Sequence, residues 1–164
     1  MGEARKVFRE RTSPRRRTGP GFHLGWNLRS LLSKKGWDDL RQSVYKKANF
    51  LCEICGGKGR KHPVECHERW EYNDARHIQK LVGLEALCPS CHEVRHIGRA
   101  LSVGRGHLAI QHMSKVNQWT PEQVEAHIQQ AMRQWNARSR FVWKLNLEWL
   151  KTLPAEFGVK SVED

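Results

Sequence analysis

Two Cys-x-x-Cys pairs are the clearest chemical signal in this chain of 164 residues. Cys52 and Cys55 form the first pair, and Cys88 and Cys91 form the second. A Cys-x-x-Cys turn directs two sulfurs to one side, so two such turns can enclose a tetrahedral ion. Zn²⁺ prefers four thiolates, and a site closed by four protein ligands is structural rather than catalytic. We therefore expect a structural Zn²⁺ that contributes to the folding free energy, with an iron–sulfur cluster as the alternative occupant.

Three histidines and a glutamate close to these pairs predict a second, reactive site. His92 directly follows the second pair and His96 comes four residues later, so a helix would carry both on one face. A strand over residues 64–68 would carry His67 and, at its end, Glu68. Packing of this strand over the helix would bring the three imidazoles together, with Glu68 able to join them. One histidine alone is more often structural, but this grouping predicts a divalent-metal site with a nearby base.

Several elements must position these residues. A short apolar patch within 22–36 predicts one or two helical turns, and apolar residues at helical spacing predict a helix over 37–49. That helix would lead the chain into the first cysteine pair. Residues 74–87 are expected to form a loop or short helix that ends at the second pair. Residues 92–99 have a helical pattern that lasts until Gly98.

The last third of the chain predicts further elements outside the site. A short helix is expected near residues 108–116. Thr120, followed by proline and by Gln123 at the third helical position, predicts a second helix that begins with a capping box. Large apolar residues alternate with polar ones over 141–149, which predicts a strand.

Composition and charge limit the kind of partner. The formal net charge is +12, which favours a polyanion and first of all nucleic acid; an anionic membrane surface is the weaker alternative. There is no run of about 18 apolar residues and no apolar stretch near the start, so neither a membrane span nor a secretory signal is expected. Paired cysteines suit metal thiolates in a reducing compartment, which predicts a cytoplasmic protein.

Basic residues gather in two parts of the chain. Residues 1–21 hold seven Lys/Arg and two Glu, and they are interpreted either as a solubilising tail or as an arm that contacts phosphates. Around the proposed site, a solvated basic surface and a DNA-binding groove are the two interpretations, of which we favour the groove. The predicted DNA-binding residues are Lys58, Arg60, Lys61, Arg69, Arg95 and Arg99.

At these positions the sequence resembles a known family. CEIC (52–55), ECHERW (65–70) and GLEALCPSCHEVRH (83–96) together resemble an HNH endonuclease of the four-cysteine type, and WDDLRQSVYKKANFLC (37–52) resembles the helix that precedes such domains. The resemblance spans residues 37–100. It implies an α+β fold with a ββα-metal core, a catalytic Mg²⁺ or Mn²⁺, and hydrolysis of DNA phosphodiesters to 5′-phosphate and 3′-hydroxyl ends.

The resemblance also implies roles for individual residues. The strand histidine, His67, would be the general base that deprotonates the attacking water, and His92 would bind the catalytic metal. By helical spacing, His96 would be a second ligand. In an alternative register, His67 binds the metal and Glu68 is the base. The family's asparagine falls on Gly83, which departs from the pattern.

These inferences give one expected organisation. Residues 1–21 are a basic arm, 22–100 an HNH nuclease domain with its leading helix, and 101–164 an extension of helices plus a strand. The extension is a possible surface for a homodimer or a protein complex. The alternative function is a non-catalytic, zinc-stabilised module that binds nucleic acid within a larger complex; it would have no use for the histidine cluster.

Overall fold

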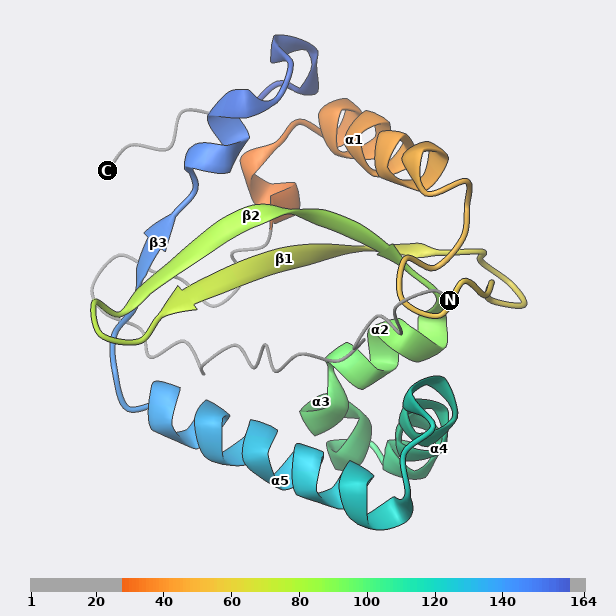
Figure 1. Cartoon of the computed structure of the whole chain (residues 1–164). Helices are drawn as coiled ribbons and strands as arrows, with labels where there is room; N and C mark the ends of the chain where they lie inside the picture. The colour runs from red at the N-terminus through yellow and green to blue at the C-terminus, as the bar shows by residue number, and fades with distance from the viewer. Residues whose placement is uncertain (1–27, 160–164) are drawn as a thin grey trace, which may run out of the picture.

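A three-stranded sheet separates the helices of this protein into two groups. The computed structural model describes residues 28–159, so the basic arm 1–21 lies outside it. The fold is α+β (Figure 1). In chain order the elements are η1 (Leu28–Leu31), α1 (Lys34–Lys47), β1 (Glu65–Asn73), β2 (Ile78–Leu87), α2 (Pro89–Arg95), α3 (Ile97–Ser102), α4 (Gly106–Asn117), α5 (Pro121–Arg138), β3 (Lys144–Asn146), η2 (Glu148–Thr152) and η3 (Ala155–Phe157).

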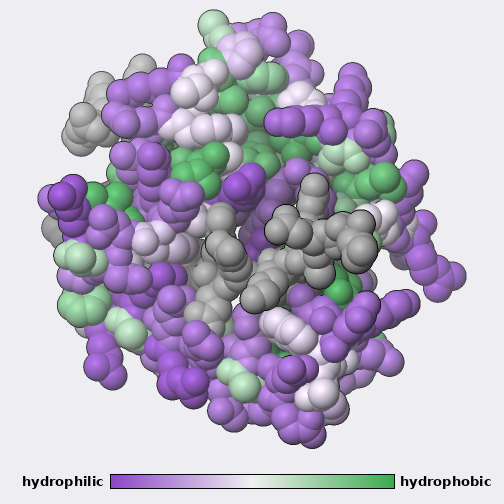
Figure 2. Space-filling model, in the orientation of Figure 1, coloured by the Kyte–Doolittle hydropathy of each residue, from purple (hydrophilic) through white to green (hydrophobic). Residues whose placement is uncertain are grey.

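The sheet provides two faces, each of which is covered. β1 and β2 form an antiparallel hairpin, and the short β3 pairs in parallel with the outer edge of β2. In Figure 1, α1 lies over one face, while α2, α3, α4 and α5 lie on the other side. Hydrophilic side chains cover most of the face visible in Figure 2, with hydrophobic ones in separate clusters. Two separate hydrophobic cores lie among the described residues, one with α2–α5 and one with α1.

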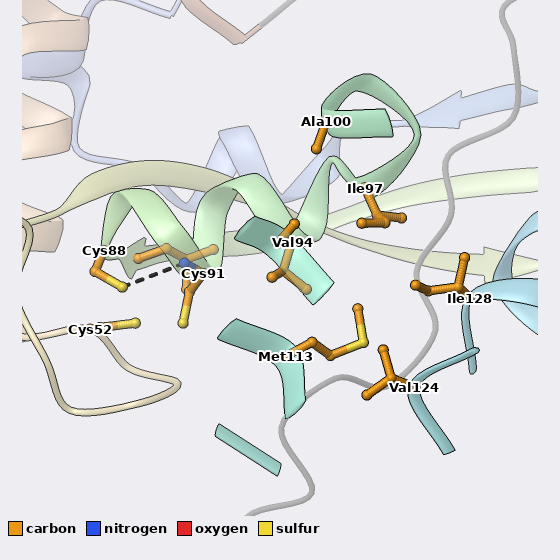
Figure 3. Packing of buried hydrophobic residues seen from close by; sticks show 11 residues of the cluster. Cys52, Cys88, Cys91, Val94, Ile97, Ala100, Met113, Val124 and Ile128 are labelled. Atoms are coloured by element: carbon orange, nitrogen blue, oxygen red, sulfur yellow. Dashed lines mark hydrogen bonds between the residues drawn. The ribbon is translucent and has the colours of Figure 1, made fainter. Parts of the chain in front are cut away.

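Each core combines early and late parts of the chain. One core surrounds the cysteine pairs and joins α2 and α3 to α4 and α5; its members include Cys91, Val94, Met113 and Val124 (Figure 3). The other packs α1 and the face of β2 carrying Leu81 against the segment after β3. Residues 101–159 thus share both cores with residues 28–100.

The expectation of a loop or short helix over 74–87 is wrong, because most of this segment is the ten-residue strand β2. Arg69 pairs with Gly83 and Trp70 with Leu81, so Val82 is an extra residue in a β-bulge. The bulge puts Leu81 and Leu84 into the same core although they are three residues apart. That spacing imitates a helix in the sequence and hides the alternation of a strand.

The other elements follow the sequence more closely. The helix expected over 37–49 begins earlier, at Lys34, because the Ser33 side chain accepts a hydrogen bond from the Gly36 N–H and caps it. The helix beginning after Thr120 has the expected capping box with Gln123. α4 agrees with the helix expected near 108–116.

Three expectations need correction. The helix expected over 92–99 is divided into α2 and α3 at His96, whose φ of −108° and ψ of 40° leave the helical region. The strand expected over 141–149 is reduced to β3, after which the chain turns into η2. Of the patch 22–36, the described part forms η1 and the first turn of α1.

Among the described residues, no helix combines the length and the apolar character needed to cross a membrane.

Candidate metal centres and catalytic site

The four paired cysteines meet beside the first turn of α2. Cys52 and Cys55 come from the loop that follows α1, whereas Cys88 is the N-cap of α2 and Cys91 lies in its first turn. The four Sγ atoms all lie within 4.8 Å of one another, with 3.7 Å between Cys55 and Cys88. Figure 3 shows the side chains of Cys52, Cys88 and Cys91 turned toward a common point. The cluster is a possible metal site, and its donor set is consistent with structural zinc.

The binding of a cation would change the protonation of these thiols. A hydrogen bond from Cys91 lowers the pKa of Cys52 to about 4. Burial, together with the neighbouring thiols, raises the pKa of Cys88 to about 11, and the hydrogen bond to Cys52 raises the pKa of Cys91. The crowded sulfurs cannot all be thiolates at neutral pH unless a positive ion offsets their repulsion. A divalent cation meets that requirement.

A histidine that the sequence did not single out supports this cluster from α4. The Nε2 atom of His112 lies 3.1 Å from the Sγ atom of Cys91. Burial lowers the pKa of His112, so the neutral imidazole can donate one N–H to the sulfur. Such outer hydrogen bonds orient metal ligands. Cys66, the fifth cysteine, stays outside the cluster, and burial raises the pKa of its thiol to about 12.

The three histidines predicted to meet do converge. His67 projects from β1, His92 from α2, and His96 from the junction of α2 and α3. Their ring centroids are 5.0 Å (His67–His92), 5.1 Å (His67–His96) and 4.8 Å (His92–His96) apart. One ring nitrogen from each histidine lies within 4.8 Å of those of the other two, so the group could hold a metal ion. The folding of α2 back across β1 and β2 produces this convergence.

The cluster keeps its central imidazole neutral. Burial, reinforced by the charges of His92 and His96, lowers the pKa of His67 to about 3. Desolvation by the packed rings also lowers the pKa of His96, although part of its side chain is exposed. At pH 7, His67 therefore has a free nitrogen lone pair. It can accept a proton or bind a metal.

Glu65 is a functional candidate that sequence reasoning did not assign. Its Oε2 atom lies 2.5 Å from the Nδ1 atom of His92. A carboxylate that accepts the Nδ1–H proton fixes the tautomer, and the Nε2 lone pair is then free for a metal. The signal was present in the sequence, because strand alternation puts Glu65 on the same face as His67.

The structure does not bring Glu68 to the imidazoles. Glu68 follows His67 in β1 and therefore points to the opposite face of the sheet. There its Oε1 atom accepts a hydrogen bond of 3.1 Å from the Leu28 backbone N–H. Gly83 has a φ of 150° at the bulge, a conformation that L side chains rarely adopt. The backbone conformation therefore explains why glycine stands at the position where the HNH family, which the sequence resembles, has asparagine.

No family model, curated protein or solved structure matches this chain. The function has to be inferred from the side chains themselves.

Cys91 and His92 are consecutive, so one turn of α2 belongs to both groups of possible metal ligands. The four-cysteine cluster therefore fixes the start of the helix that presents His92 to His67.

A cleft of about 330 Å³ opens beside His92 and His96. Glu65 and Glu93 line it together with two basic residues, Arg99 and Arg105. Arg105 is paired with Glu93, with 2.6 Å between Nε and Oε1, whereas Arg99 is exposed at the wall. The cleft is large enough for a small anionic group. Its two carboxylates balance its two guanidinium groups, and Arg99 is the cation there that could face a phosphate.

The predicted DNA-binding residues occupy different positions. Arg95 contacts Glu85 at 3.1 Å, and its side chain is only 12% exposed, so it lies mostly inside the fold next to the histidines. The other five are exposed: Lys58, Arg60 and Lys61 in the loop between Cys55 and β1, Arg69 on β1, and Arg99 on α3. Only Arg99 among the six lines the cleft.

Proposed function

We propose that this protein is a metal-dependent endonuclease of the HNH type that hydrolyses DNA phosphodiester bonds. The observation that carries the proposal is the convergence of His67 with His92 and His96, two residues that line a cleft together with Arg99. The consecutive order β1, β2, α2 supports a ββα-metal core, because the resemblance implies that order around its histidines.

His67 has the properties of the general base. Burial keeps its ring neutral, and in the proposed mechanism this ring would accept a proton from the water whose oxygen attacks the phosphorus atom. The bond from phosphorus to the 3′ oxygen then breaks and that oxygen gains a proton, which leaves 5′-phosphate and 3′-hydroxyl ends. Glu65 holds His92 in the tautomer that a metal ligand needs.

Two metals of different roles are part of the proposal. His92 and His96 would hold Mg²⁺ or Mn²⁺, which when bound supplies Lewis-acid stabilisation of the charge that develops on the leaving oxygen. The four cysteines would hold a structural Zn²⁺. Free thiols in paired motifs suit a reducing compartment, so a cytoplasmic location belongs to the same proposal.

The competing function is a zinc-stabilised module that binds nucleic acid without cutting it. Its best support in the sequence is the glycine that stands in place of an asparagine. The bulge at Gly83 accounts for that glycine through backbone conformation alone. A pure binding module also gives no reason for three packed imidazoles, two of which line a cleft, or for a carboxylate that orients one of them.

Nicking of supercoiled plasmid with Mg²⁺ or Mn²⁺ tests the proposal. Cleavage by His67→Gln should fall by about 100-fold or more, because general-base catalysis contributes 10²–10⁴-fold. His92→Ala should fold but lose cleavage. His127→Gln, on α5 against Trp119, is the matched control and should cut like the wild type.

Two results would contradict the proposal at different levels. If pure wild-type protein shows no metal-dependent cleavage over a range of salt concentrations, the binding module becomes the better description. If His67→Gln cuts as fast as the wild type, the assignment of the base is wrong.

A further inference from the structure

An ion pair and a cation–π contact join the end of α5 to the tip of the β1–β2 hairpin. The Arg138 guanidinium binds both oxygens of Asp74, at 2.7 and 2.9 Å, and lies 4.2 Å from the centre of the Tyr72 ring. The indole N–H of Trp143 donates to the Arg138 carbonyl at 2.9 Å. These contacts already hold the hairpin, α5 and β3 together.

Beside this contact lies a pair of stacked rings that is not needed to hold α5 against the hairpin. The rings of His77 and Phe141 are stacked, with centroids 4.1 Å apart and an angle of 19°. Trp143 supports His77 from its edge at 5.6 Å, and the Lys144 N–H donates to the His77 carbonyl at 2.8 Å. Phe141 is nevertheless 46% exposed. Trp143 and the Lys144 N–H thus hold His77 in place, whereas the Phe141 ring is partly exposed to solvent.

The surroundings of this pair are positively charged. Arg76 precedes His77 and Arg140 precedes Phe141; both are exposed, as is Lys144. The nearest carboxylate in the turn, Asp74, is neutralised by Arg138. An exposed aromatic ring with exposed basic residues next to it in the chain is complementary to a nucleotide, which offers a flat base and a phosphate.

We infer that the His77–Phe141 pair is a stacking platform for an unpaired nucleic-acid base. The base would lie on the exposed face of Phe141 as a third ring, and Arg76 and Arg140 would neutralise its flanking phosphates. This inference rests on the proposed nucleic-acid substrate but not on cleavage. Every base has a flat π-face, so stacking does not distinguish one base from another. The platform would therefore bind single strands of any sequence.

The platform lies at the opposite end of β1 from the proposed catalytic site. Six residues separate His67 from Asn73 at the hairpin turn, which is about 20 Å at 3.3 Å per residue. A nucleic-acid strand that touches both places would have to span this distance. A duplex keeps its bases stacked on one another and offers none to Phe141. The inferred ligand is therefore a single-stranded segment next to the bond that is cut.

Fluorescence anisotropy with the full chain tests the inference, using labelled 12-nucleotide single strands of DNA and RNA of one sequence and the matching DNA duplex. No Mg²⁺ or Mn²⁺ is added, so the result does not depend on cleavage. Phe141→Ala should weaken single-strand binding by about 5- to 100-fold, which is the range for loss of one stacked base. Phe141→Trp should retain it.

Val142→Ala is the control, because Val142 is 67% exposed and has no ring. It should change single-strand affinity by less than about twofold, and Phe141→Ala should leave duplex affinity unchanged. If only DNA or only RNA responds, the base-stacking ligand is restricted to that nucleic acid. Equal effects of Phe141→Ala and Val142→Ala, equal losses on single strand and duplex, or no single-strand binding would each overturn the inference.

Discussion

At the scale of single residues, the Glu65 carboxylate decides which nitrogen of His92 faces the site. A neutral imidazole carries its proton on one of two nitrogens, and the contact of 2.5 Å to Nδ1 selects that one. In the neutral ring, the remaining nitrogen then faces the site with its lone pair. Under the proposed function, Glu65 would act on a bound metal through His92 and would be a positioning residue.

Replacement of Glu65 by Gln should weaken Mn²⁺ binding by about 10- to 100-fold, the usual cost of losing a carboxylate behind a metal-bound histidine. Titration calorimetry of Mn²⁺ into the zinc-loaded protein measures this directly. Cleavage should recover at high Mn²⁺, since His67 is intact. Glu68→Gln is the matched control, because Glu68 lies on the other face of β1 and should leave Mn²⁺ affinity unchanged. Equal losses in the two variants would refute the role of Glu65.

At the scale of elements, the bulge in β2 requires a glycine. Replacement of Gly83 by Asn, the residue that the family resemblance would favour there, should lower the free energy of unfolding by about 1–3 kcal/mol, because φ of 150° is strained for any L side chain. Steric conflict is not the cause, since an added Cβ would lie 4.0 Å from the Trp149 indole nitrogen.

Urea unfolding of Gly83→Asn, Gly83→Ala and Gly98→Ala separates these causes. Gly98 lies in α3 with no atom within 4 Å of an added Cβ, so Gly98→Ala should stabilise by up to about 1 kcal/mol. The two Gly83 variants should destabilise by similar amounts. A more stable Gly83→Asn protein would show that the bulge tolerates a side chain.

Parts of the site could be predicted from the sequence, but the strand with the bulge could not. The convergence of His67, His92 and His96 was predictable, because strand alternation and helical spacing are local patterns that the fold preserved. β2 was not predictable, because Val82 interrupts the alternation and gives Leu81 and Leu84 a helical spacing. Strand alternation alone puts Glu68 on the face opposite His67, and only its hydrogen bond from the Leu28 N–H, forty residues earlier, is not encoded by a local pattern.

The first turn of α2 depends on Cys88 in two ways. Its Sγ atom accepts the Cys91 N–H at 3.4 Å as a helix cap, and it belongs to the four-cysteine cluster. Serine is a good N-cap, so Cys88→Ser should keep the cap and remove only the metal ligand. We expect loss of bound zinc and unfolding, since about 10–16 kcal/mol of metal binding exceeds or equals the stability of most domains.

Metal content by mass spectrometry and a thermal melt by circular dichroism check this outcome. Cys66→Ser is the control, because Cys66 is half-buried and stands apart from the four-cysteine cluster. It should retain one zinc and a cooperative melt. A folded Cys88→Ser protein without zinc would contradict a structural role for the site.

At the scale of the whole molecule, the sheet divides the basic residues between two sides. His67 and the cleft face α2 and α3, whereas Lys34 and the rest of α1 lie over the opposite face (Figure 1). A net charge of +12 would attract nucleic acid to any side. Only cations close to the bound phosphates, however, release counterions when the complex forms.

The salt dependence of duplex binding should therefore distinguish the two sides. Each neutralised phosphate contributes about 0.9 to the slope of log K against log salt concentration. Arg99→Ala, at the cleft wall, should weaken binding and reduce the slope by about 1, whereas Lys34→Ala, which removes the same formal charge, should leave the slope unchanged. Anisotropy between 50 and 200 mM salt, without added Mg²⁺, measures both. Identical slopes for the two variants would mean that the histidine face is not the side on which DNA binds, because the cleft would then contribute no more than net charge does.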